Sequence, residues 1–392
     1  MTVLTKENAE KKLRFHYLDG LRGLAALYVV LVHVEPSLTE TLPAFVELFT
    51  KTLRYGRFSV VIFIVLSGYG LMMSVMRSQS NYISGGLVNY IKRRSRRILP
   101  AYYAALLCCV ILAAVILNLE KFTTFEWNAF VGKGPFFPNL SLKDILAHAL
   151  LIHNLSPETY MSINPPLWAV ATEWQLYFIF PLLLLPIWRR FGLTLPVIVG
   201  FLMGIAPLYL LNGLFKQAAP WYIGLFALGM AAADIGFSQK PKLIAMRNSL
   251  PWGMLTIFFT VIAFLTEWRK LGLDIWISES FFGLATACLF INCTKRVIDG
   301  KKLPRYLRVF EHPLAIALGT FSYSLYLIHG PVLVLVRYFL FNLQLSPGIF
   351  AVISYLLGVA VSLVIAYLFY LVFERPFMPD FLKKGKVKDA VN

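Results

Sequence analysis

The sequence is poor in charge and in cysteine. Only 15% of its 392 residues are charged and 58% are hydrophobic, with a mean hydropathy of +0.68, whereas soluble domains contain about 25% charged residues. The four cysteines lie in or at the ends of apolar segments and show neither metal-type spacing nor a disulfide framework (Cys108, Cys109, Cys288 and Cys293). This composition argues against a soluble domain or a cysteine-based metal centre and indicates an integral membrane protein.

Several recognisable motifs are also missing. There is no Gly-x-Ser-x-Gly elbow, no P-loop and no His-Glu-x-x-His helix, so serine-hydrolase and metal chemistry have no motif support. No internal repeat is visible. Residues 1–16 are polar and basic, and the apolar run that follows has no small-residue cleavage site after it, so we expect the first helix to be retained rather than removed as a signal peptide.

Apolar runs long enough to cross a bilayer predict ten membrane-spanning helices. They cover residues 18–35, 58–76, 98–118, 167–188, 193–212, 218–237, 251–267, 275–293, 313–341 and 348–373. The last two are long, and a tilt or a kink near Gly330-Pro331 is expected. Residues 119–166 form the longest polar insertion, with an amphipathic or re-entrant helix expected at 142–154. The predicted fold class is all-α, a polytopic transmembrane helical bundle, with one transmembrane domain at 1–380 and a short basic tail at 381–392.

The net charge of +17 has two readings. In a soluble protein it would suggest nucleic acid, but basic cytoplasmic loops explain it better in a membrane protein. With the N-terminus inside and ten spans, most of the 37 Lys and Arg residues fall in cytoplasmic connections. We therefore expect both termini to be cytoplasmic, no nucleic-acid partner, and a multi-pass protein in the lipid bilayer of the plasma or inner cell membrane.

The first predicted span carries two costly polar side chains, Arg22 and His33. They are eleven residues apart, just over three helical turns, so both project from one face and lie roughly 16 Å apart along the axis. Ionisable groups at membrane depth mark function by default. The alternative is that Arg22 extends to the membrane surface and that His33 satisfies a local hydrogen bond.

Two further sets of charged residues belong to predicted spans or their ends. Glu173 has no basic residue within four positions on its helix, so it needs a partner on another helix or stays protonated; a structural hydrogen bond between helices is an alternative. Arg94 and Arg97, in the basic run 92–97, are three residues apart and could grip one polyphosphate. The alternative for this run is that it sets topology and meets anionic lipid.

Small polar side chains form a third group. Ser322, Tyr326 and His329 share one helical face at i, i+4 and i+7. Together with Ser67 they could line a polar cavity. They could also form hydrogen bonds between helices, which are common in membranes. The pair Ser67-Gly68 permits close approach of another helix.

Six segments, in this order along the chain, resemble the membrane acyltransferase 3 family. They are Leu18–Ala26 followed by His33 (its Arg-x10-His pattern), Phe63–Tyr69, Arg94–Pro100 (Arg-x-x-Arg-Ile-x-Pro), Leu167–Glu173 with Phe178–Pro181, Phe321–His329, and Glu374–Pro376. Two positions depart from the family pattern, because Val61 stands where an Asp is frequent and Ala169 where a Ser is frequent. The resemblance implies the stand-alone form, without the C-terminal esterase-like domain that some members carry.

The resemblance implies an O-acyltransferase that moves an acyl group, commonly acetyl, from cytoplasmic acyl-CoA to a hydroxyl of a carbohydrate, glycolipid or other acceptor. In that reading Arg94 and Arg97 bind the CoA phosphates, and Arg22 extends this positive lining inward. His33 is a general base or a transient acyl carrier, and Glu173 orients an imidazole or deprotonates the acceptor. Acyl-CoA is a co-substrate, and neither a bound cofactor nor a metal is expected.

Two other functions remain open from the sequence. A proton-coupled transporter or flippase for a glycan or lipid-linked substrate would use Arg22, His33 and Glu173 as a proton relay. A non-enzymatic receptor or scaffold would not depend on His33 and leaves the arginine run unexplained.

Overall fold

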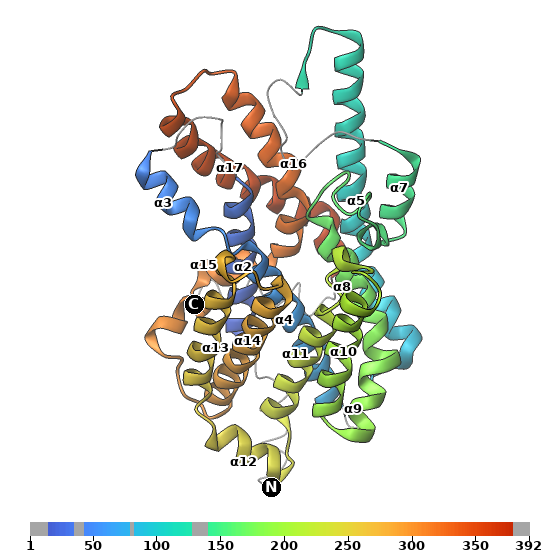
Figure 1. Cartoon of the computed structure of the whole chain (residues 1–392), viewed down its shortest axis with the longest axis vertical. Coiled ribbons are helices and arrows are strands. Elements are labelled where there is room, and N and C mark those ends of the chain that lie inside the picture. The colour runs from blue at the N-terminus through green and yellow to red at the C-terminus, as the bar shows by residue number, and fades with distance from the viewer. Residues whose placement is uncertain (1–14, 35–42, 79–81, 128–139, 379–392) are drawn as a thin grey trace.

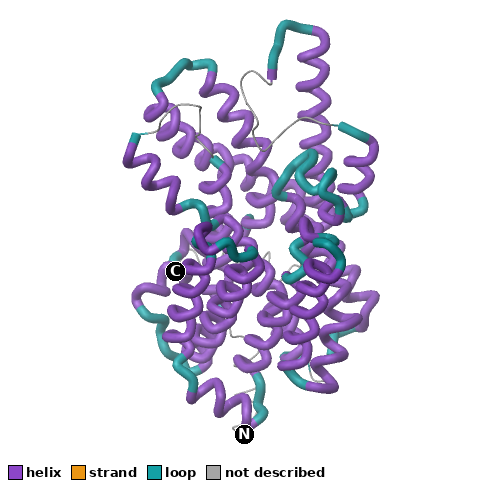
Figure 2. The backbone as a smooth tube through the Cα atoms, in the orientation of Figure 1, coloured by secondary structure: helices purple, strands orange, loops and turns teal. Residues whose placement is uncertain are grey.

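The computed structural model describes residues 15–34, 43–78, 82–127 and 140–378, and these residues form helices and connecting loops without a β-strand (Figures 1 and 2). The predicted all-α fold is therefore confirmed for this part of the chain. The predicted basic tail at 381–392 and most of the basic N-terminal segment lie outside the described residues.

Helices occur at all ten predicted spans. The helices that carry these spans are α2 (His16–His33), α4 (Gly56–Met76), α5 (Gly86–Phe122), α8 (Leu167–Ile179) with α9 (Leu185–Phe191), α10 (Thr194–Leu210), α11 (Tyr222–Phe237), α13 (Trp252–Thr266), α14 (Ile275–Ile298), α15 (Pro313–Thr320) with α16 (Ser322–Phe341), and α17 (Pro347–Phe369). Shorter helices lie between them: α3 (Ala44–Thr52), α7 (Leu142–Ala149) and α12 (Pro241–Ser249). The short helix expected within 142–154 is thus present as α7.

Length and composition qualify seven of the described helices as membrane spans, or eight if the bent pair α12 and α13 counts as one span. The predicted number of ten is therefore not confirmed. Helix α10 is apolar but has only 17 residues. In α2 the charged side chains of Asp19 and Arg22 interrupt the apolar sequence. The segment 313–341 is not one span, because the chain breaks at Phe321 between α15 and α16, whereas α16 continues through Gly330-Pro331.

Glycines set the closest approach between helices α4 and α11. A Cβ atom at Gly68 would lie 2.0 Å from the carbonyl oxygen of Phe226, and one at Gly229 would lie 2.0 Å from that of Val65. Neither position can hold a side chain without moving a backbone. The prediction that Ser67-Gly68 allows close helix approach is therefore confirmed, in the manner of small-residue contacts between membrane helices.

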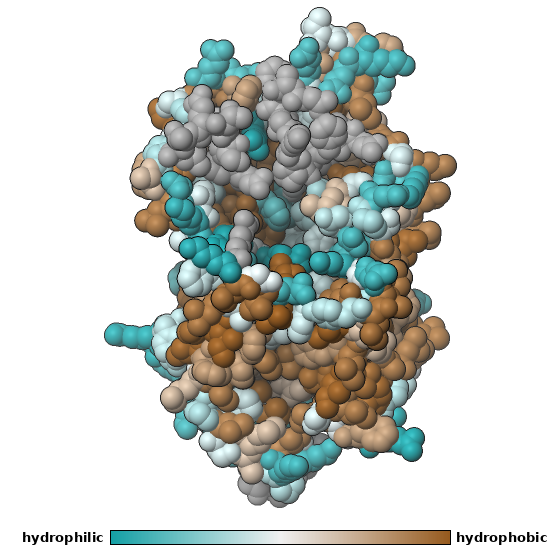
Figure 3. Space-filling model, viewed as in Figure 1, coloured by the Kyte–Doolittle hydropathy of each residue, from teal (hydrophilic) through white to brown (hydrophobic). Residues whose placement is uncertain are grey.

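The outer surface carries many large hydrophobic side chains. Those on α10 and α13 include Ile198, Leu202, Met254, Ile257 and Phe258, and hydrophobic surface covers much of the lower half of Figure 3, where these helices lie. Apolar surface on this scale faces lipid rather than water. The chain is an integral, multi-pass membrane protein.

Candidate functional site

His33, the last residue of α2, meets His329 of α16. The His33 Nδ1 and the His329 Nε2 are 3.1 Å apart, and the His329 Nδ1 lies 3.0 Å from the carbonyl oxygen of Leu325. His329 is fully buried and His33 is partly exposed. Two histidines that are 296 residues apart in the sequence thus form one hydrogen-bonded pair.

The hydrogen bonds assign the protons of this pair when both imidazoles are neutral. The Leu325 carbonyl can only accept, so the His329 Nδ1 carries a proton and its Nε2 is an acceptor. The His33 Nδ1 must then donate to that Nε2, because one member of the pair has to supply the hydrogen. As a result the His33 Nε2 keeps its lone pair, which is the state that a general base needs.

A second polar group surrounds Glu173 on α8. The hydroxyl of Ser67, on α4, donates to the Glu173 Oε1, and the hydroxyl of Tyr177 donates to the same oxygen at 2.5 Å. The charges of Arg22 and Arg94 also act on this carboxylate. Glu173 therefore has a partner on another helix, Ser67, and this contact is a hydrogen bond between helices of the kind given as its structural alternative.

The arginines of the basic run differ in their surroundings. Arg94 and Arg97 are half-buried, while Lys92, Arg93 and Arg96 are exposed. The Arg94 guanidinium lies 5.4 Å from the ring centre of Tyr177. The positive charges at 94 and 97 thus turn inward, as their spacing of three residues predicts, and the other cations of the run face outward.

Arg22 joins the same group from α2. Its Nη1 lies 3.6 Å from the Asp19 carboxylate, and its charge is close enough to Arg97 for the two to repel. The structure therefore brings Arg22, Arg94, Arg97, Ser67 and Glu173 together between α2, α4, α5 and α8. We call this set the arginine cluster. The histidine pair lies at the other end of α2.

The remaining predicted cavity residues have structural partners. Tyr326 donates its hydroxyl to the Pro166 carbonyl at 2.9 Å, and its ring centre lies 5.9 Å from that of His329. Ser322 donates to the Gly319 carbonyl within its own turn, at 3.1 Å. Tyr326 therefore forms part of the wall beside the histidine pair, whereas Ser322 is engaged in a local hydrogen bond.

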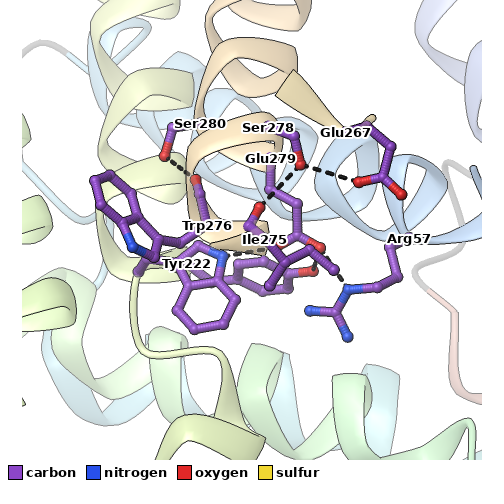
Figure 4. Close-up of polar contacts among 9 residues, drawn as sticks. Arg57, Tyr222, Glu267, Ile275, Trp276, Ser278, Glu279 and Ser280 are labelled. Atoms are coloured by element: carbon purple, nitrogen blue, oxygen red, sulfur yellow. Dashed lines mark hydrogen bonds and ion pairs between the residues drawn. The ribbon is translucent and has the colours of Figure 1, made fainter. Parts of the chain in front are cut away.

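An ion pair that the sequence analysis did not identify lies near the first turn of α4 (Figure 4). The Arg57 Nε donates to the Glu279 Oε1 at 2.6 Å, and the Trp221 indole donates to the Glu279 Oε2 at 2.6 Å. The Arg57 guanidinium also lies 5.2 Å from the ring centre of Trp168. The sequence did hold a sign of this pair, because Glu279 is a carboxylate inside a predicted span, and ionisable residues within membrane spans mark functional sites by default.

The two departures from the acyltransferase 3 pattern lie in packed surroundings. Val61 is fully buried and Ala169 is 6% exposed. Neither carries charge, so the arginine cluster obtains no carboxylate from position 61. Among the residues that the structure describes, no group of three or more His, Cys, Asp or Glu could hold a metal ion.

The polar insertion holds a second pair of histidines. The rings of His148 and His153 stack with their centres 3.8 Å apart, and both side chains are buried. The His148 Nδ1 bonds to the Asp144 carbonyl at 2.9 Å. Burial, together with the neighbouring His148, lowers the pKa of His153 to about 3, so this imidazole stays neutral at physiological pH.

Comparisons with known proteins address the family. A family model described as "Acyltransferase domain" matches residues 15–371. The chain is 24% identical over 410 residues to a protein of Staphylococcus aureus strain COL named "Putative O-acetyltransferase", an alignment that covers 95% of this chain and 59% of that protein. It is 22% identical over 388 residues to O-acetyltransferase OatA of Staphylococcus aureus strain NCTC 8325, covering 94% and 57%.

The chain spans little more than half the length of these curated relatives. No solved structure matches it. The family model nevertheless covers nearly the whole chain, from the start of α2 to the end of α17. The family predicted from the six motifs is therefore confirmed, and the chain belongs to the acyltransferase domain family.

Proposed function

We propose that this protein transfers an acyl group, specifically acetyl, from cytoplasmic acetyl-CoA to a hydroxyl of a carbohydrate or glycolipid acceptor at the plasma or inner cell membrane. The observation that carries the proposal is the arrangement along α2. A group of cations lies near one end of this helix, and a histidine with an available lone pair lies at the other.

The arginine cluster suits the polyanionic part of acetyl-CoA. Arg97 repels both Arg22 and Arg94, and the carboxylates of Asp19 and Glu173 offset only part of the positive charge of the three arginines. A bound phosphate group relieves this repulsion and accepts charge-assisted hydrogen bonds from the guanidinium groups. Arg22 and His33 lie roughly 16 Å apart along α2, a separation of the order that an extended pantetheine arm covers between the phosphates and the thioester.

His33 then acts as the general base. Its Nε2 takes the proton of the acceptor hydroxyl while the oxygen attacks the thioester carbonyl carbon. The C–O bond forms, the C–S bond breaks, and the imidazolium returns the proton to the departing CoA thiolate. His329 is a positioning residue, because its Nε2 holds the His33 Nδ1–H and stabilises the charge that His33 gains, as the third group of a triad does.

The test uses the full chain, purified in lipid nanodiscs, with acetyl-CoA labelled in the acetyl group. Thiol release and labelled product measure transfer, and binding of acetyl-CoA is measured separately. We expect His33→Ala to keep folding and acetyl-CoA binding and to abolish transfer, while His312→Ala, which removes an imidazole outside the pair, transfers normally.

Three outcomes would contradict the proposal. Wild-type transfer by His33→Ala removes the assigned base. Labelled acetyl that remains on the wild-type protein without acceptor assigns the carrier role to His33 instead. Movement of a glycan or a proton without consumption of acetyl-CoA favours the transporter.

A further inference from the structure

The Arg57–Glu279 pair combines deep placement with an accessible guanidinium. Arg57 contacts Trp168 of α8 and Glu279 of α14, and Tyr222 of α11 donates to the same Glu279 carboxylate. Its partner Glu279 is completely buried, yet the Arg57 side chain remains 41% exposed. In Figure 4 the Nε side of the guanidinium points at the carboxylate and the two terminal nitrogens point away from it. Among the described residues, Glu279 holds this guanidinium through its Nε, and the terminal N–H groups remain available to a ligand.

Arg57 lies beside the end of α2 that carries His33. Helix α4 begins beside the end of α2, since a Cβ atom at Gly56 would lie 2.8 Å from the Val32 Cγ1. Arg57 and His33 are the next residues of the two helices. The close approach of Gly56 to Val32 therefore places the start of α4, and with it Arg57, beside the His33 end of α2.

The segment 164–168, which ends in the first turn of α8, has residues near each of these two side chains. A pocket beside the histidine pair is lined by His33, Asn164, Pro165 and Pro166, among others. Two residues after Pro166, Trp168 lies against the Arg57 guanidinium. His33 thus lines a pocket with residues 164–166, and Arg57 contacts Trp168 of the same segment.

The chemistry of the pair favours a neutral, oxygen-rich group. Glu279 balances the Arg57 charge, so the site does not attract an anion as strongly as the arginine cluster does. The planar guanidinium still offers two parallel N–H groups, a geometry that fits two oxygens held side by side. Glu279 and Trp168 hold the Arg57 side chain in one orientation, which reduces the conformational entropy that this side chain loses when a ligand binds.

We propose that Arg57 binds the acceptor, donating its two terminal N–H groups to neighbouring hydroxyl oxygens of a polyhydroxylated molecule whose reacting hydroxyl faces His33. This inference rests on the proposed function. It assigns Glu279 and Trp168 as the residues that position Arg57, and it makes a vicinal diol, as found on sugar rings, the preferred acceptor.

The test compares two acceptors that differ in one hydroxyl, cis-1,2-cyclohexanediol and cyclohexanol. The full chain in nanodiscs is supplied with acetyl-CoA, and kcat/KM is measured for each alcohol by thiol release and ester product. We expect the wild type to prefer the diol about tenfold, the effect of one buried hydrogen bond to a charged group. Arg57→Lys keeps the positive charge and loses the two parallel N–H groups of the guanidinium. The ratio of kcat/KM for the diol to that for cyclohexanol therefore falls to about one, while KM for acetyl-CoA stays the same.

Two further variants complete the design. Arg54→Lys, three residues away on the exposed end of the same region, is the matched control and keeps the diol preference. Glu279→Gln removes the charge that orients Arg57 and is expected to reduce the preference in the same direction, which covers the case in which Arg57→Lys does not fold.

The role of Arg57 and the proposed acyl transfer fail in different ways in this test. A wild type without diol preference, or Arg57→Lys with the full preference, overturns the role of Arg57 and leaves acyl transfer intact. A wild type that releases no thiol with either alcohol or with water overturns the proposed function and this inference together.

Discussion

Replacing His329 by leucine tests the role of the histidine pair most directly. The His329 Nε2 is the acceptor, 3.1 Å away, for the His33 Nδ1–H. Leucine fills similar space but offers no acceptor, so His33 loses this partner in a largely buried site and keeps its backbone hydrogen bond to Val29. That loss costs about 1–3 kcal/mol, and if it falls on the transition state it lowers kcat by about 5- to 150-fold, because each 1.36 kcal/mol is a factor of ten.

Acetyl-CoA binding should not change in the His329→Leu variant. The arginine cluster lies at the other end of α2, so KM and Kd for acetyl-CoA should not change in His329→Leu. His329→Gln is the matched variant, because its side-chain oxygen can still accept from the His33 Nδ1–H. We expect Gln to recover a large part of the activity that Leu loses, although it gives up the bond to the Leu325 carbonyl.

The assay is steady-state acetyl transfer by the purified protein, with acetyl-CoA binding and thermal unfolding measured on the same preparations. A His329→Leu variant with wild-type kcat would refute the reasoning, since it would show that His33 needs no orienting acceptor. An equal loss in Leu and Gln, with lower thermal stability in both, would assign His329 to packing alone.

Three further predictions concern other parts of the molecule. Arg94→Ala should weaken acetyl-CoA binding and reduce the salt dependence of that binding. Arg96, in the same run, is exposed, so Arg96→Ala should change neither. If wild type and Arg94→Ala show equal Kd values in titrations at two salt concentrations, the basic run serves only to set membrane topology. Gly68→Ala should lower the free energy of unfolding by about 1–3 kcal/mol because its Cβ meets a backbone carbonyl at 2.0 Å, while Gly70→Ala, which meets nothing within 4 Å, should not destabilise the protein in thermal unfolding. Because the pKa of His153 is lowered on folding, the unfolded chain binds a proton there more readily below about pH 6.5, so stability should fall as pH drops from 7 to 4 and His153→Phe should flatten that dependence.

The sequence was sufficient for the fold class and the family. Spans of apolar residues must satisfy their backbone polar groups internally, so helices were the expected structure wherever such runs occur. Helix boundaries depend on tertiary contacts and were less predictable. The segment 313–341 breaks at Phe321, just after Gly319, where a Cβ atom would lie 2.0 Å from the Asp19 carbonyl oxygen. Helix α15 packs on α2 at that point, which no local pattern predicts.

Helical spacing also predicted which charged residues share a face. Arg94 and Arg97 turn inward together, and Arg22 joins them, because positions on a helix follow from its geometry alone. Glu173 was recognised as a charge that needed a partner. The partner itself, Ser67, lies 106 residues away in the sequence and on another helix, so only the packing of α4 against α8 could identify it.

The sequence by itself therefore determined the helical membrane fold, the family and the residues that carry charge or an imidazole within it. Only the tertiary structure decided how these residues pair. His33 meets His329 and not Glu173, and Arg57 pairs with Glu279. The physical reason is that such pairs join helices far apart along the chain, and the contacts that bring those helices together depend on the shape of every side chain between them.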